Sequence, residues 1–197
     1  MRVLLLVIWM LIPVGVLAFH LGPGQDHLKL DSAAQLLSEA DALVQAEDWS
    51  QAQLVYEKAL ANIPDEKTEL RIKVQLQRAK VQMQNSQLPQ AYSDLKSLVS
   101  TLNEDPNSDP ELVKEARAAL ANSQYYITWL KRLEGLPREE WESDIVSAQQ
   151  TLRLLAKEAE QSDEDEEFEV YTKDLESAVR LARMDLGELQ GLPLPSQ

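Results

Sequence analysis

One helix-packing pattern occurs twice in this chain, and it constrains the fold more than any other feature. Two sets of small or apolar residues share the same steps of three, four, three and four: Trp49, Ala52, Tyr56, Ala59 and Ile63, then Leu88, Ala91, Leu95, Leu98 and Leu102, 39 positions later. These steps keep each set on one face of an α-helix. Repetition at a fixed period predicts a stacked array of similar helical units, an architecture that usually binds other proteins.

The composition fits a helical domain of ordinary size with one core. Of the 197 residues, 44% are hydrophobic and only 6% are aromatic. Ala, Leu, Gln, Glu and Lys dominate, and these residues lose little conformational freedom on entering a helix. We therefore predict an all-α fold.

The charge and the missing residue types exclude several functions. The net charge of −14 argues against nucleic acid as a partner, because phosphate binding needs a clustered basic surface. The chain has no cysteine, and its two histidines, His20 and His27, lie near the N-terminus. It also lacks a glycine-rich phosphate loop. We expect no catalytic residues, no cofactor and no metal site.

The N-terminus carries a predicted membrane segment. Residues 3–19 contain no charge and follow Arg2. About nineteen helical residues span roughly 28 Å, close to the thickness of a hydrocarbon core. Residues 1–24 are therefore expected to form a membrane anchor or uncleaved signal, and residues 25–30 a linker.

The same segment predicts where the rest of the chain lies. Arg2 favours a cytoplasmic N-terminus, because positive residues stay on that side. The protein would then be single-pass in the cell membrane, with its helical domain periplasmic or extracellular. A cleaved signal peptide is the alternative, because Val16 and Ala18 have the spacing that signal peptidase accepts.

Seven further helices are expected between residues 31 and 191, separated by turn signals. Pro64 closes the second helix, and Asp109 with Pro110 gives an N-cap and a first-turn proline. The predicted elements are three helical hairpins and a capping helix, at about 31–63, 68–102, 110–161 and 163–190. Residues 192–197 are expected to be a flexible tail.

The paired helices resemble tetratricopeptide repeats. Ala52, Tyr56, Ala59 and Pro64, preceded by Asp48-Trp49, are similar to the second helix of that repeat. Its small-residue positions in neighbouring helices are occupied as well, by Ala40, Ala79, Ala91 and Ala118. The resemblance implies a tetratricopeptide-like array that binds proteins or peptides in a concave groove.

This chain departs from the family pattern at several positions. Glu39 and Arg78 stand where the family usually has leucine, and Leu36 and Gln75 where it has tryptophan. The 39-residue spacing also exceeds the usual period of about 34. The similarity is good from about residue 33 to 103 and poor from 111 to 160, so a plain array of helical hairpins is the alternative.

The predicted helix over residues 68–84 supplies the candidate binding site. Lys73 and Lys80 share one stripe of this helix, because at 100° per residue they lie about 20° apart. The resemblance places Lys73, Leu76, Lys80 and Met83 on the groove. Their partner would be a protein or peptide, with an acidic segment or C-terminus. Ordinary pairing of these lysines with the abundant acidic residues is the alternative interpretation.

A second candidate surface is aromatic. Tyr125, Tyr126 and Trp129 form the densest aromatic group, with Trp141 across the next turn. Such a cluster can form a peptide pocket, but packing within a hairpin is the favoured interpretation.

These features together predict a membrane-anchored adaptor or scaffold of the bacterial envelope. It would display its groove outside the cytoplasm. The alternatives are a structural subunit held in a membrane complex by a permanent helical interface and a secreted form released by signal cleavage. The sequence leaves the oligomeric state open.

Overall fold

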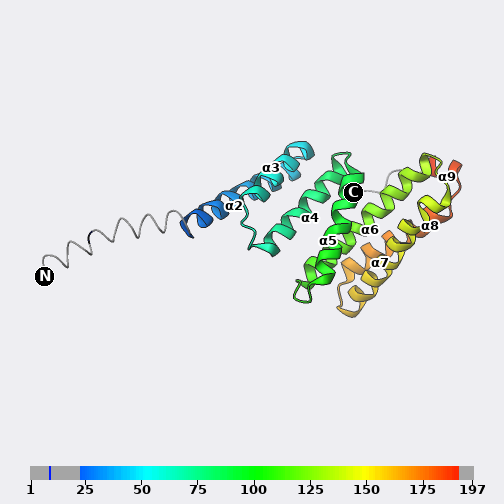
Figure 1. Ribbon diagram of the computed structural model, residues 1–197. Coiled ribbons are helices and arrows are strands. Elements are labelled where there is room, and N and C mark those ends of the chain that lie inside the picture. The colour runs from blue at the N-terminus through cyan, green and yellow to red at the C-terminus, as the bar shows by residue number, and fades with distance from the viewer. Residues whose placement is uncertain (1–8, 10–22, 191–197) are drawn as a thin grey trace. The chain divides into compact units, whose positions relative to one another are not determined.

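A computed structural model describes residue 9 and residues 23–190 of the chain (Figure 1). The predicted membrane segment and the predicted tail over 192–197 lie outside the described residues, apart from Trp9, Pro23 and Gly24. From residue 23 to 190 the chain is all-α, and eight helices pack sequentially as antiparallel neighbours. The all-α prediction is confirmed, and the arrangement is consistent with a helical repeat.

Most helix boundaries agree closely with those expected. The helices are α2 (Pro23–Gln45), α3 (Trp49–Asn62), α4 (Thr68–Gln84), α5 (Leu88–Glu104), α6 (Pro110–Leu133), α7 (Glu142–Gln161), α8 (Asp165–Arg183) and α9 (Leu186–Gln190). A 3₁₀ turn over Arg138–Glu140 precedes α7. The chain divides into two compact units, at Arg78 within α4, where a single core was expected. Each helix of an array packs mainly on its sequence neighbours, so such a chain need not share one core.

The linker predicted at residues 25–30 is wrong, because these residues belong to α2. Proline is well suited to the first turn of a helix, where its missing N–H has no partner to lose. Pro23 therefore begins this helix instead of ending the one before it. No glycine or proline follows between Gln25 and Leu30 to stop it.

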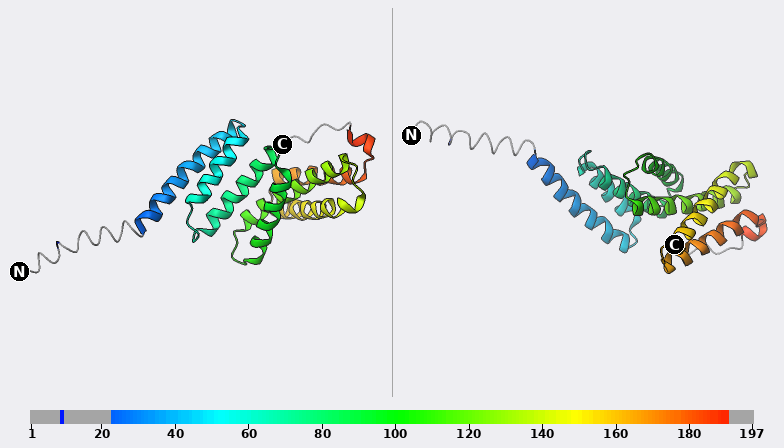
Figure 2. Two further views of the ribbon diagram at one scale, coloured as in Figure 1. Left: turned by 45° about the horizontal axis from the view of Figure 1, so that its top comes forward. Right: turned by 90° about the horizontal axis from the view of Figure 1, so that it is seen from below.

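Four alanines set the packing of the first unit. Ala33 and Ala40 of α2, and Ala52 and Ala59 of α3, have no exposed surface (0%). Each pair is spaced by seven residues, about two helical turns, and so lies on one face. The two helices pack against each other in opposite directions (Figure 2). A methyl group at each contact lets the helix axes approach closely.

Two polar contacts fix the same unit. The Tyr56 hydroxyl donates to the Asp41 carboxylate at 2.7 Å, which joins α3 to α2. Burial and the neighbouring Asp41 raise the pKa of Tyr56, which keeps the hydroxyl protonated as the donor. Arg71 Nη1 of α4 donates to the carbonyls of Leu60 and Ile63, at 3.1 and 2.7 Å. Arg71 thereby satisfies backbone acceptors that the end of α3 leaves without helical partners.

The second unit is built on the repeated pattern and on a cluster of later helices. Leu88, Ala91, Leu95, Leu98 and Leu102 are all buried, so the pattern marks the inner face of α5 as predicted. A further core joins α6 through α9, and its buried members are Ala121, Trp141, Ile145, Ala148, Leu152, Ala178, Leu181 and Leu189.

The capping helix expected over residues 163–190 is interrupted. α8 ends at Arg183, and α9 begins at Leu186. The Glu188 N–H donates to Asp185 Oδ1 at 2.8 Å, and the Asp185 N–H donates to Glu188 Oε2 at 3.1 Å. This reciprocal arrangement is a capping box, which starts a new helix at that point.

Arg132 of α6 closes the end of α8 in the same way that Arg71 closes α3. Its guanidinium donates to the carbonyls of Leu181 and Met184. It also lies over the Trp141 ring, 4.8 Å from the ring centroid. In both helices, the two carbonyls that accept from the arginine belong to the C-cap residue and to the residue three positions before it.

We predict that Ala52→Glu or Ala91→Glu lowers the free energy of unfolding by roughly 2 to 4 kcal/mol, because each introduces bulk and an unpaired charge into a close helix contact. Chemical denaturation followed by circular dichroism measures the effect. Ala61→Glu is the matched control, since Ala61 lies on α3 and is exposed. Unchanged midpoints in both buried variants would contradict the assigned packing.

Candidate functional site

The candidate site is a hollow of about 540 Å³ in the second unit, which we call the α4–α6–α8 groove. Alternate helices line it, with a single contribution from α7. The lining residues are Lys80, Met83, Gln84, Glu111, Lys114, Glu115, Ala118, Ala119, Asn122, Leu152, Glu167, Val170, Tyr171 and Asp174. A groove lined by every second helix is the surface that a helical array offers to a partner.

Local sequence explains why the groove is hollow. The α6 residues that line it are spaced by three or four, which places them on one face of that helix. Ala118 and Ala119 lie in the middle of this face, where their short side chains leave space. On α8, Val170 is 53% exposed and presents an apolar side chain to that space.

Lys114 forms ion pairs with three carboxylates at the groove. Its side chain is only 16% exposed, and its Nζ lies 2.9, 3.2 and 3.1 Å from carboxylate oxygens of Glu111, Glu164 and Glu167. The hydrogen bonds that Lys114 donates to these carboxylates, that to Glu111 foremost, raise its pKa. Because Glu164 is the N-cap of α8, the cluster ties α6 to the start of that helix.

The groove as a whole is acidic. Lys80 Nζ of α4 lies 2.5 Å from Glu115 Oε1 of α6, so this lysine is ion-paired as well. Four carboxylates line the groove, those of Glu111, Glu115, Glu167 and Asp174, against the two lysines Lys80 and Lys114. The arrangement therefore favours a basic ligand over an acidic one.

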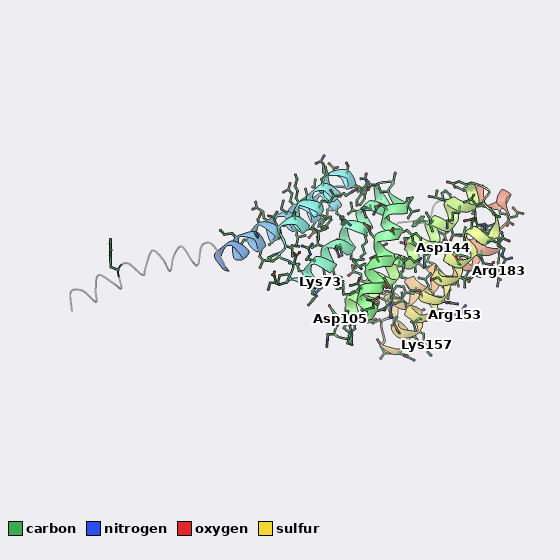
Figure 3. The ribbon with its side chains drawn as sticks, viewed as in Figure 1. Lys73, Asp105, Asp144, Arg153, Lys157 and Arg183 are labelled. Atoms are coloured by element: carbon green, nitrogen blue, oxygen red, sulfur yellow. The ribbon has the colours of Figure 1, made fainter. Side chains whose placement is uncertain are left out.

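The four residues predicted to bind a peptide do not share one surface. Lys80 and Met83 line the groove, whereas Lys73 lies in the first unit and pairs with Glu69 at 2.6 Å (Figure 3). Leu76 has no exposed surface (0%), so it is a core residue and cannot supply the exposed apolar contact expected of it. The pairing of both lysines agrees with the alternative interpretation of these charges.

The aromatic group is mainly part of a core. Tyr125 and Trp129 pack against the buried cluster of α6 through α9. The Tyr125 and Tyr126 rings meet edge to face, 5.5 Å apart at 84°. The packing of Tyr125 and Trp129 therefore agrees with the hairpin interpretation.

Sequence reasoning missed a buried polar contact around Asp144. Its carboxylate accepts hydrogen bonds from the Tyr92 hydroxyl at 2.6 Å and from Lys131 Nζ at 2.8 Å. Asp144 (labelled in Figure 3) lies on α7. The tyrosine lies on α5 and the lysine on α6. Burial, followed by the hydrogen bond to Asp144, raises the pKa of Tyr92 to about 12. No signal in the sequence pairs residues so far apart.

Two kinds of feature are absent from the described residues. Among residue 9 and residues 23–190, no group of three or more His, Cys, Asp or Glu side chains has the geometry to hold a metal ion. None of the helices formed by these residues combines the length and apolar character that a membrane crossing requires.

Comparison with known proteins identifies no relative: no family model, curated protein or solved structure matches the chain.

We predict that Tyr92→Phe lowers the free energy of unfolding by about 1 to 2 kcal/mol near pH 7, because Asp144 loses a buried donor. A tyrosine with a raised pKa stabilises the fold fully below its unfolded pKa of about 10. That stabilisation is lost as the pH rises through the folded value of about 12. Denaturation of both proteins across this range should show their difference disappearing, whereas a constant difference would contradict the assignment.

Proposed function

We propose that this chain is a protein-interaction module of tetratricopeptide-like architecture whose α4–α6–α8 groove binds a segment of another protein. The observation that carries the proposal is the groove itself, which three alternate helices line. Sequential antiparallel packing and the buried small residues at the repeat positions support the family resemblance.

The lining chemistry indicates the class of ligand. Met83, Val170 and Tyr171 offer apolar contact, and carboxylates outnumber lysines by four to two. A segment with an apolar side chain beside a lysine or arginine complements both features. The acidic or C-terminal peptide expected from the sequence stays a prediction, and the same binding experiment includes it.

The N-terminal sequence supports a location for the module. The uncharged residues 3–19, preceded by Arg2, favour a single-pass anchor with the helices outside the cytoplasm. An adaptor or scaffold of the bacterial envelope has this arrangement. A subunit with a permanent helical interface is the second candidate, which the partly exposed apolar residues Phe168, Leu175 and Val179 of α8 favour.

We predict that a fragment of residues 23–197 binds a fluorescent peptide of alternating leucines and lysines more tightly than its leucine–glutamate counterpart, and that salt weakens the binding. Val170→Lys should weaken it about tenfold, because a repelling charge replaces an apolar contact. Fluorescence polarisation measures the affinities.

Val146→Lys is the matched control, since Val146 is 40% exposed and lies on α7 outside the groove. Equal losses in the two variants would show a general charge effect and place binding elsewhere. Tighter binding of the glutamate peptide would favour the acidic ligand predicted from the sequence.

We predict that the full-length protein stays in the membrane pellet after alkaline carbonate extraction, and that protease added to spheroplasts digests the helices. An uncharged segment of this length is expected to remain in the bilayer. Release of a soluble form beginning near Phe19 would show instead that the segment is a cleaved signal.

A further inference from the structure

Helix α8 has a second surface beside the one that lines the groove. At 100° per residue, nine of its positions fall within an arc of about 140°. We call this surface the α8 outer face, and it consists of Asp165, Phe168, Glu169, Thr172, Leu175, Glu176, Val179, Arg180 and Arg183. The fully buried residues of this helix, Ala178 and Leu181, lie outside the arc.

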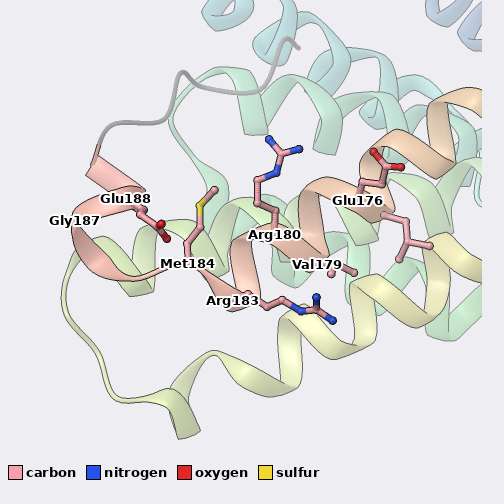
Figure 4. Close-up of a pocket in the computed structure, with 8 residues that line it drawn as sticks. Glu176, Val179, Arg180, Arg183, Met184, Gly187 and Glu188 are labelled. Atoms are coloured by element: carbon pink, nitrogen blue, oxygen red, sulfur yellow. The ribbon is translucent and has the colours of Figure 1, made fainter.

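The outer face is only partly covered. Phe168, Leu175 and Val179 form an apolar strip along it, and each is intermediate in exposure. At the C-terminal end of the strip is a hollow of about 890 Å³, between α8 and α9. Figure 4 shows Val179, Arg180 and Arg183 projecting from α8 beside this hollow. Partly buried apolar residues next to a hollow are typical of a surface that another helix can cover.

Charge divides the outer face into two halves. The acidic residues Asp165 and Glu169 lie near its start, and the basic residues Arg180 and Arg183 lie in its last turn. With Glu176 included, the face carries three acidic and two basic residues, in a chain whose net charge is −14. This face is therefore nearly neutral in a strongly acidic protein.

We propose that the α8 outer face binds the same face of a second copy of this chain, with the two helices antiparallel. Pairing about a midpoint at residue 174 places Asp165 opposite Arg183 of the second copy and Glu169 beside its Arg180, and the apolar strip then meets the same strip of the second copy. Two-fold symmetry makes each contact twice. A parallel pairing would instead set like charges against each other.

The absence of cysteine makes a clean test possible, because one introduced thiol is then the only one in the chain. Glu176 is exposed and lies near the proposed midpoint. A cysteine at this position is therefore close to the same cysteine of the second copy. The full-length Glu176→Cys protein is solubilised in detergent and treated with a short bis-maleimide cross-linker. We expect a covalent dimer at least ten times more abundant than with Val146→Cys, the control on α7.

Charge reversal tests the predicted pairing. Arg180→Glu with Arg183→Glu, added to the Glu176→Cys protein, should reduce cross-linking at least tenfold, because acidic residues then face acidic residues. Asp165→Lys with Glu169→Lys should do the same. Mixing these two reversed proteins should restore the dimer, since each supplies the charge that the other lacks.

Two results would contradict the proposal. Cross-linking at residue 176 that does not exceed the control would overturn the proposal and leave a different protein as the occupant of this face. Failure of the mixed pair to cross-link, with both proteins helical by circular dichroism, would overturn the antiparallel arrangement. All substituted residues are exposed, so no buried contact is removed.

Discussion

The close approach of helices at buried alanines is the constraint on which the rest of this structure depends. Ala52 and Ala59 in the first unit, and Ala91, Ala148 and Ala178 in the second, have no exposed surface. A methyl group holds neighbouring axes close enough for the leucines and tyrosines beside it to interlock. Where no helix packs directly against it, an alanine leaves empty space. On the inner side of α6, alanines leave the hollow that becomes the groove.

Local patterns explain how much of the fold the sequence could predict. The helices from residue 49 to 104 follow from steps of three and four and from their turn residues, all within a few positions of one another. The two errors in helix boundaries arose where a local signal has two meanings. Pro23 can end one helix or begin the next, and Asp185 with Glu188 is a capping box inside a run that otherwise favours helix.

The candidate site was predictable only in part, because its defining contacts join distant residues. The family resemblance placed Lys80 and Met83 on the groove, but it also placed Leu76 there, which the fold buries. A helical stripe shows which residues share a face and not which neighbour covers it. Lys80 pairs with a glutamate 35 positions away, a contact that no periodicity in one helix can reveal.

Two cations of α6 join it to α8, and these two helices form two walls of the groove. Lys114, near the start of α6, pairs with Glu164 and Glu167 at the start of α8, and Arg132, near the end of α6, donates to carbonyls at the end of α8. The two helices are thus held at both ends. Both lysines of the groove take part in ion pairs with its carboxylates, and the four lining carboxylates still outnumber the two lysines. The contacts that join the walls of the groove therefore also occupy its lysines, so the excess of negative charge favours a basic ligand.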